Sequence, residues 1–225
     1  IPLYPYGHYP SRFVYRDDDH DDSDKTFLGQ TGRFNGEDIV DIIVKQPAAA
    51  RFLSRHLYNF FVADEPQVPA WEQVPPGDPE AIETLMRAYT ESGGDIRSIL
   101  RTLFNSDFFK DARSKKVKSP TELVAGVIKL VGTYRFPRPG LLEYAEATTL
   151  MGQALFDPPT VEGWHEGEEW VDSGALVERV NFVAEQMRDV EQPGVRAMID
   201  RLAAQDGGTL SPEELVDGCL DLMGP

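Results

Sequence analysis

The segment 152–170 (GQALFDPPTVEGWHEGEEW) gathers the residue types that could do chemistry in this chain. Its carboxylates could act as the acid and the base of a hydrolase, and its tryptophans could stack on a sugar ring. Adjacent prolines and several glycines predict a loop held in one shape, which we call the tryptophan loop. The side chains that could take part are Asp157, Glu162, Trp164, His165, Glu166, Glu168 and Trp170.

Each of these features also has a purely structural explanation. In a chain with 38 acidic residues, carboxylate pairs such as Glu143 and Glu146 arise by chance. A tryptophan is more often buried than exposed as a platform, because its burial gives a large hydrophobic gain. We therefore expect the tryptophan loop to be structural, and we keep hydrolysis of a polysaccharide through its acidic residues as the alternative.

Three arginines lie in tracts rich in core residues, namely Arg51, Arg55 and Arg179. A guanidinium in such a tract needs an anionic or carbonyl acceptor, because a buried charge without a partner is costly. We expect Asp157 or backbone carbonyls of the tryptophan loop to be those acceptors, so that the arginines clamp the loop. A pocket that binds an anion is the alternative.

Other catalytic and cofactor patterns do not occur in the sequence. There is no GxSxG, HExxH or CxxCH motif, and Cys219, the only cysteine, falls on an apolar helix face where a thiol is inert. His56 lies between Phe52 and Phe60 at helical spacing, which favours a core or boundary residue over a catalytic base. The sequence therefore contains no recognisable catalytic constellation. It leaves open whether the chain is an enzyme, and it predicts no cofactor and no metal.

An acidic tract, DDDHDDSD, occupies residues 17–24. Its alternating aspartates resemble the start of a calcium loop, but the sixth position is Asp22 and the twelfth is Leu28, so an EF-hand is excluded. We expect the tract to be a solvated turn that joins two strands, 12–16 and 26–28, in a hairpin. A bound calcium ion in this turn is the open alternative.

The overall charge restricts the partners. With 22 basic against 38 acidic residues, the formal net charge is -16, which repels nucleic acid and anionic lipid. No run of about 18 apolar residues occurs, so no membrane insertion is predicted. A protein partner is the preferred prediction, with a polysaccharide as the alternative.

Capping signals and helical periodicity predict an all-α, multi-helix domain of about eight or nine helices with a small N-terminal β-hairpin. The apolar helix that begins after Ser119 is expected at the centre of the core, and the helix after Pro47 is expected to turn Phe60 and Phe61 inward. We divide the chain into a helical domain, residues 1–190, and a packed C-terminal helix pair, residues 191–225. The expected caps or first residues are Asn35, Pro47, Asp78, Asp95, Ser119, Ser173, Pro193 and Ser211.

Several tracts in order carry a family resemblance. They are KTFLGQTGRFNGEDIVDIIVKQPAAARFLSRHLYNFFVADEP, ESGGDIRSILRTLFNSDFF, GQALFDPPTVEGW, EW and ALVERVNF. Together they resemble the C-terminal portion of the bacterial family named domain of unknown function 1800, over about residues 20–187. The resemblance implies a largely helical fold, a further helical N-terminal portion, and an exported protein, extracellular or periplasmic, encoded beside a partner of another family.

Two parts of the chain depart from that pattern. Residues 165–169 (HEGEE) replace the further glycines of the family's loop, and residues 193–223 are expected to fall outside the resemblance. The chain begins with neither an initiator methionine nor a signal peptide, which favours a processed piece of a longer protein. We therefore interpret the chain as a non-catalytic interaction or scaffold domain of an exported bacterial protein, with a polysaccharide hydrolase as the alternative.

Overall fold

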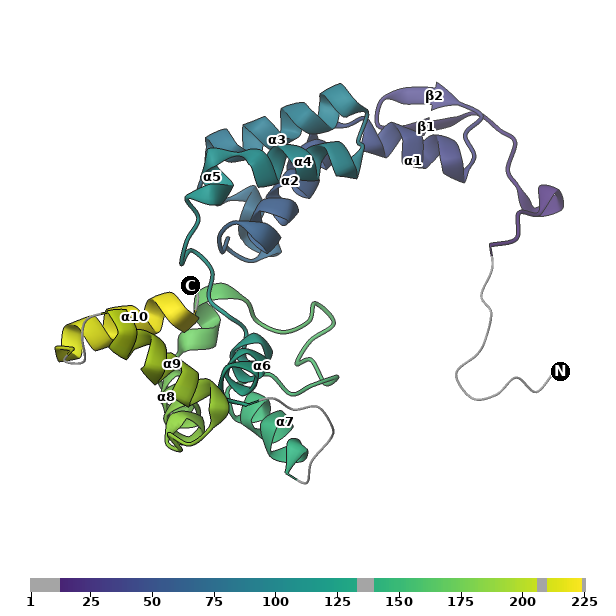
Figure 1. The fold of residues 1–225 in the computed structure, drawn as a ribbon. Helices are drawn as coiled ribbons and strands as arrows, with labels where there is room; N and C mark the ends of the chain where they lie inside the picture. Colours follow the sequence, from purple (N-terminus) through teal and green to yellow (C-terminus); the bar gives the residue numbers. More distant parts are fainter. Residues whose placement is uncertain (1–12, 133–139, 206–209, 224–225) are drawn as a thin grey trace, which may run out of the picture. The chain divides into compact units, whose positions relative to one another are not determined.

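The computed structural model describes residues 13–132, 140–205 and 210–223 (Figure 1). These residues form ten α-helices, three short 3-10 helices and one two-stranded antiparallel sheet. The predicted all-α class with an N-terminal hairpin is therefore confirmed. The contacts divide the chain into two units, residues 1–49 and 50–225, which we describe separately.

The hairpin of the first unit differs from the predicted one. Strands β1 (Lys25–Phe27) and β2 (Gln30–Gly32) pair with Thr26 opposite Thr31. The turn between them is Leu28 and Gly29, whose φ angles of 46° and 79° match the twist of a two-residue hairpin. The prediction of strands at 12–16 and 26–28 joined by the acidic tract is therefore wrong. Residues 13–16 form no strand, and residue 12 lies outside the described part.

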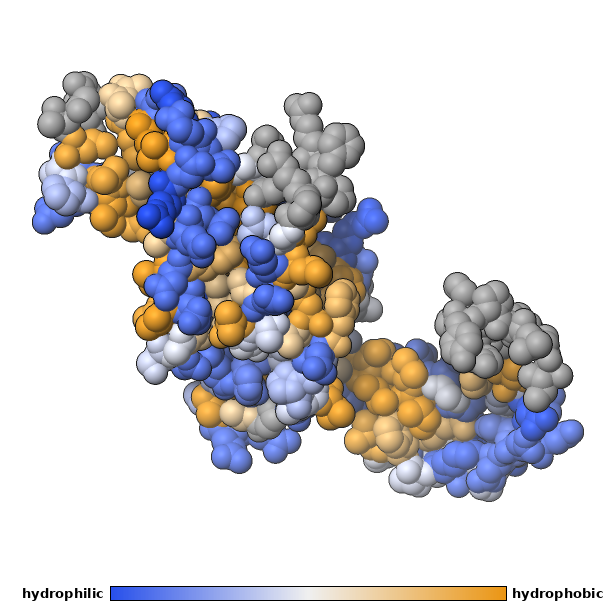
Figure 2. All heavy atoms as spheres, turned by 90° about the horizontal axis from the view of Figure 1, so that it is seen from below, coloured by the Kyte–Doolittle hydropathy of each residue, from blue (hydrophilic) through white to orange (hydrophobic). Residues whose placement is uncertain are grey.

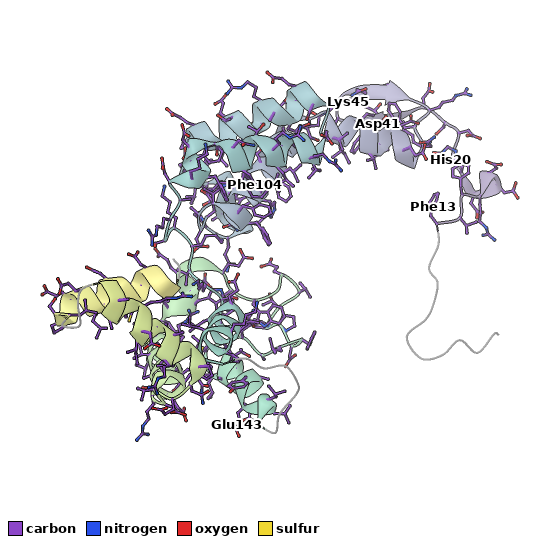
Figure 3. The ribbon with its side chains drawn as sticks, in the orientation of Figure 1. Phe13, His20, Asp41, Lys45, Phe104 and Glu143 are labelled. Atoms are coloured by element: carbon purple, nitrogen blue, oxygen red, sulfur yellow. The ribbon has the colours of Figure 1, made fainter. Side chains whose placement is uncertain are left out.

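The acidic tract instead forms the 3-10 helix η1 (Asp17–Asp19) and a bend. Arg16 pairs with Asp19 at 3.0 Å, and the Nδ1 atom of His20, labelled in Figure 3, lies 2.9 Å from a carboxylate oxygen of Asp22. Among the described residues, no three acidic, histidine or cysteine side chains are grouped to hold a metal ion. Helix α1 (Gly36–Val44) follows, with Asn35 as its cap, as predicted.

The second unit begins within α2 (Pro47–Phe61), which packs with α3 (Pro79–Ser92), α4 (Ile96–Asn105) and the single turn α5 (Asp107–Lys110). Helices α3 and α4 lie side by side in Figure 1, because the left-handed Gly93 ends the first and Asp95 caps the second. The buried side chains of this cluster are Tyr58, Val62, Ala81, Ile82, Leu85, Ile99 and Leu103.

A second cluster surrounds α6 (Pro120–Val131). This helix packs against α7 (Leu141–Leu150), α8 (Ser173–Met187) and α9 (Pro193–Gln205), which confirms its predicted central place. Helix α10 (Pro212–Met223) packs on α9. Helix α8 is capped by Asp172, whose carboxylate is better placed than the predicted Ser173, the first helical residue. The division at residue 190 stays a prediction.

The approach of α9 to α6 depends on a glycine. A Cβ at Gly194 would lie 1.6 Å from the carbonyl oxygen of Leu130, so only glycine fits there. This close contact brings Val195 into the cluster of Val124 and Phe182. Elsewhere, exposed apolar side chains are interspersed with polar ones over the face shown in Figure 2, and no helix of the described residues is long and apolar enough to cross a membrane.

Candidate functional site

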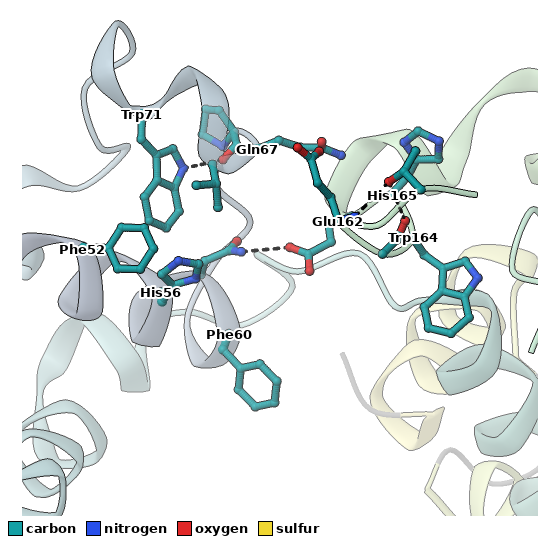
Figure 4. A pocket seen from close by; sticks show the side chains of 14 residues that line it. Phe52, His56, Phe60, Gln67, Trp71, Glu162, Trp164 and His165 are labelled. Atoms are coloured by element: carbon teal, nitrogen blue, oxygen red, sulfur yellow. Dashed lines mark hydrogen bonds between the residues drawn. The ribbon is translucent and has the colours of Figure 1, made fainter. Parts of the chain in front are cut away.

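Helix α2 presents an aromatic stripe at intervals of four residues, formed by Phe52, His56 and Phe60. Trp71, from the 3-10 helix η2 (Val68–Glu72), packs against it. The ring centre of His56 lies 4.4 Å from that of Phe52 and 4.6 Å from that of Trp71. Figure 4 shows these rings together on one side of a pocket. Phe60, which we expected inside, is 72% exposed, because it lies at the edge of the stripe.

Behind the aromatic stripe, Arg55 holds the loop 64–77, which we call the proline loop. Arg55 is 2% exposed, and its guanidinium donates from Nε to Glu65 at 2.6 Å. Its other nitrogens donate to the carbonyls of Trp71, Val74 and Pro75 at 3.3, 2.9 and 3.3 Å. The other carboxylate oxygen of Glu65 accepts from the backbone N–H of Gly77 at 2.8 Å. One buried ion pair therefore fixes the path of the whole proline loop.

The tryptophan loop forms the opposite side of the pocket. Trp170 is buried at 5% exposure and packs beside Gly152, which anchors the two ends of the loop. Trp164 is half-buried, and its Nε1 donates to the carbonyl of Ala154 at 3.1 Å. His165 pairs with Glu169. Between these points the chain is exposed, and Phe156 has a positive φ of 63°.

Two contacts connect the tryptophan loop to the other walls of the pocket, one to α2 and one to the proline loop. The side-chain amide of Asn59 donates to Glu166 at 3.0 Å, drawn as a dashed line in Figure 4, while its carbonyl oxygen accepts from the backbone N–H of Glu65 at 2.9 Å. Gly167, with φ of 61°, packs on Asp64, where an added Cβ would lie 3.1 Å from that of Asp64. Asp64 also accepts from Lys116 at 2.9 Å. Asn59 therefore touches both loops.

The two loops and α2 enclose a pocket of about 500 Å³, within the usual size of ligand sites. Its described lining contains two glutamates and neither lysine nor arginine. Burial lowers the pKa of His56, and the nearby Glu166 opposes that shift only in part, so His56 is neutral at pH 7. The pocket therefore combines aromatic walls with negative charge. Its aromatic and acidic members are Phe52, His56, Phe60, Trp71, Glu162, Trp164, His165 and Glu166.

The predicted arginine clamps on the tryptophan loop are wrong for two of the three residues. Arg55 is bound to the proline loop, as described above, and Arg179 donates to the carbonyl of Lys118 at 2.9 Å. Arg179 is buried, which lowers its pKa, and its Nε has no hydrogen-bond partner among the described residues. Arg51 is exposed on α2. The prediction failed because the path of the chain decides which carbonyls and carboxylates lie near each arginine. The spacing of residues along one helix does not reveal that path.

The structure brings together some of the predicted site residues and separates others. Glu162, Trp164 and His165 line the pocket, whereas Asp157 is exposed and lies outside its lining. Trp170 is buried and is not part of the lining. Sequence reasoning missed Phe52, Asn59, Phe60, Gln67 and Trp71 as members of the site. The usable signals were the aromatic residues at four-residue spacing in α2 and a tryptophan inside a proline-rich loop.

Comparison with known proteins places the whole chain in one family. No curated protein and no solved structure matches it. The family match extends from residue 6 to residue 223, beyond the expected 20–187, so it includes the C-terminal helix pair that we expected outside the resemblance. Because this match covers far more than half of the sequence, the chain belongs to the family described as protein of unknown function (DUF1800).

Proposed function

We propose that this chain is a non-catalytic interaction domain that binds a partner protein in the pocket between α2, the proline loop and the tryptophan loop. The observation that carries the proposal is the pocket itself. One of its walls is fixed by the buried pair of Arg55 and Glu65, and its rim exposes Phe52 and Phe60. Preorganised walls with exposed aromatic residues are typical of sites where a partner inserts a side chain.

The polar groups of the pocket support binding over catalysis. Glu166 accepts a hydrogen bond from Asn59, and His165 is paired with Glu169. His165 is therefore engaged inside the fold and Glu166 keeps only one carboxylate oxygen free, whereas a general acid or base must be available to the substrate. We extend the proposal to an exported bacterial protein, extracellular or periplasmic, because the family resemblance implies it.

The proposal is tested by probing arrays of synthetic peptides and of glycans with the purified chain and with the variant Phe60→Ser. Phe60 is largely exposed, so its replacement should not disturb the fold. Leu142→Ser is the matched control, because Leu142 is similarly exposed but lies on α7, outside the pocket lining. We expect peptides that bind the unmodified chain and the control but not Phe60→Ser, and that remain intact by mass spectrometry. Binding that is the same for all three proteins would refute the proposal.

A second candidate, a polysaccharide hydrolase, is favoured by one observation. Glu162 and Glu166 line the same pocket as Trp164, so carboxylates and an indole face one space. A turnover screen on diverse glycans tests this candidate. If it holds, activity is lost in Glu162→Gln and kept in Asp157→Asn, because Asp157 lies outside the pocket lining.

A further inference from the structure

The charged groups that line the pocket point to the ligand class. We infer that the pocket receives a basic side chain, arginine or lysine, flanked by apolar residues, from a partner polypeptide. This inference rests on the proposed interaction function and names its ligand. Glu162 and Glu166 supply negative charge, and the described lining holds no lysine or arginine to neutralise it. His165 also lines the pocket, but it is paired with Glu169. His56 does not compensate either, because burial keeps it neutral at pH 7.

The carboxylates are placed for a charge-assisted contact. Glu162 is exposed at the rim of the pocket. Glu166 uses Oε2 to accept from Asn59, and we assign its Oε1 to the incoming cation. A guanidinium or ammonium group is the natural donor to such carboxylates. The chain's net charge of -16 also attracts a basic partner over longer distances.

The aromatic rings suit the apolar stem and the cationic head of such a side chain. Phe52 and Phe60 are 52% and 72% exposed, so each offers free ring surface at the pocket. The fold already contains one cation–π contact beside the pocket, where the guanidinium carbon of Arg55 lies 4.6 Å from the ring centre of Trp71. A cation over an aromatic face is favourable, and more so when it is partly desolvated.

A sugar ring fits the same walls less well. Stacking on Trp71 would compete with Arg55, Phe52 and His56, which already pack against its ring. The indole N–H of Trp164 is bonded to Ala154, so it is not available to a sugar hydroxyl. The exposed ring surface therefore belongs to phenylalanines, beside carboxylates, which favours a cation with an apolar stem.

The test uses three fluorescein-labelled hexapeptides that differ only at a central position, which is arginine, citrulline or glutamate, flanked by leucines. Citrulline keeps the shape of arginine without its charge. Binding is measured by fluorescence anisotropy at low and at moderate salt. We expect the arginine peptide to bind about tenfold more tightly than the citrulline peptide, and the glutamate peptide to bind weakest. Added salt should reduce the preference.

Two variants assign the preference to the pocket. Glu162→Gln should reduce the preference for arginine over citrulline to about threefold or less. Glu168→Gln makes the same charge change on an exposed residue outside the pocket lining and should leave the preference intact. Equal binding of arginine and citrulline, an unchanged preference in Glu162→Gln, binding of glycans alone, or no binding of any peptide would overturn the inference.

The outcomes also separate this inference from the proposed function. If the peptides bind equally, and their binding is lost in Phe60→Ser but kept in Leu142→Ser, the pocket is an interaction site without a preference for cations. The proposed function then stands and only the ligand class is wrong. If binding does not depend on Phe60, the proposed function falls as well.

Discussion

The two loops that line the pocket are held in opposite ways. The proline loop, residues 64–77, has its carbonyls bound from inside by the buried guanidinium of Arg55. The tryptophan loop, residues 152–170, is fixed near its ends, by Trp170 and by contacts of Glu166 and Gly167, while Phe156 between them is 97% exposed. The first loop is organised by one buried charge, and the second by contacts at its edges.

This difference assigns the two loops different parts in binding. A wall built on a buried ion pair keeps its shape, because any displacement leaves a desolvated charge without its partner. A wall attached at its edges can adjust to a ligand at small cost. We therefore expect stability to depend mainly on the proline loop and ligand selectivity mainly on the tryptophan loop. The following changes test that contrast.

The largest effect is expected from Arg55→Ala. It leaves Glu65 buried without its partner and frees three loop carbonyls, so the free energy of unfolding should fall by about 3–5 kcal/mol in urea denaturation. Arg51→Ala is the control, because Arg51 is exposed on the same helix and should change stability by less than about 0.5 kcal/mol. If both variants lost a similar free energy of unfolding, the buried ion pair would not be what holds the proline loop, and the contrast between the two loops would be wrong.

A smaller effect is expected from Gly167→Ala, at the edge of the tryptophan loop. The added methyl group adopts an unfavourable positive φ and crowds Asp64, so we expect a loss of about 2 kcal/mol by thermal or urea unfolding. Gly163→Ala has a positive φ as well, but its Cβ meets no atom within 4 Å. It should therefore cost only the backbone term, about 1 kcal/mol. If Gly163→Ala costs as much, the contact with Asp64 contributes nothing.

The coupling between the loops is expected to be smaller again. Because Asn59 bonds both Glu65 and Glu166, Asn59→Ala should destabilise more than Glu166→Gln. A double-mutant cycle with these two changes should give a coupling energy of about 0.5–1 kcal/mol. A coupling indistinguishable from zero would mean that the hydrogen bond across the pocket is not maintained in solution.

The smallest effect concerns pH. The folded chain lowers the pKa of His56 from its ordinary value of 6.5, so the unfolded chain takes up the proton first as the pH falls. Above about pH 6.5 His56 is mostly neutral in both states and does not reduce the free energy of unfolding. That free energy falls as the pH drops from there through the pKa of His56 in the folded chain. Unfolding measured between pH 7.5 and about pH 5 should show a shallower pH dependence in His56→Gln than in the unmodified chain. Identical slopes would contradict the prediction.

Signals that act within one turn of the chain predicted the helices well. Asparagine, aspartate or serine caps identified the starts of α1, α3, α4, α6 and α10, because the cap bonds backbone groups two or three residues away. The predicted strand positions of the hairpin were wrong because its turn is formed by Leu28 and Gly29, and leucine with a positive φ is not a usual turn signal.

The site could not be derived in the same way, because its contacts join distant parts of the chain. Asn59 and Glu166 are separated by 107 positions, and nothing local indicates that they meet. The partner of Arg55 lies only 10 positions away, but inside an irregular loop whose path follows no period. Composition pointed to the tryptophan loop, part of which lines the pocket, while the aromatic stripe of α2 resembled ordinary core.

The exposed Phe156 also predicts where a protease cleaves the folded chain first. A protease needs an accessible segment, and the tryptophan loop offers Phe156, an aromatic residue that is almost fully exposed. Chymotrypsin should therefore nick the native chain after Phe156 before it cuts the proline loop. The two fragments should stay associated, because α6 on one side of the nick packs against α8 and α9 on the other. Susceptibility to cleavage thus follows from the same contacts that leave this loop adjustable.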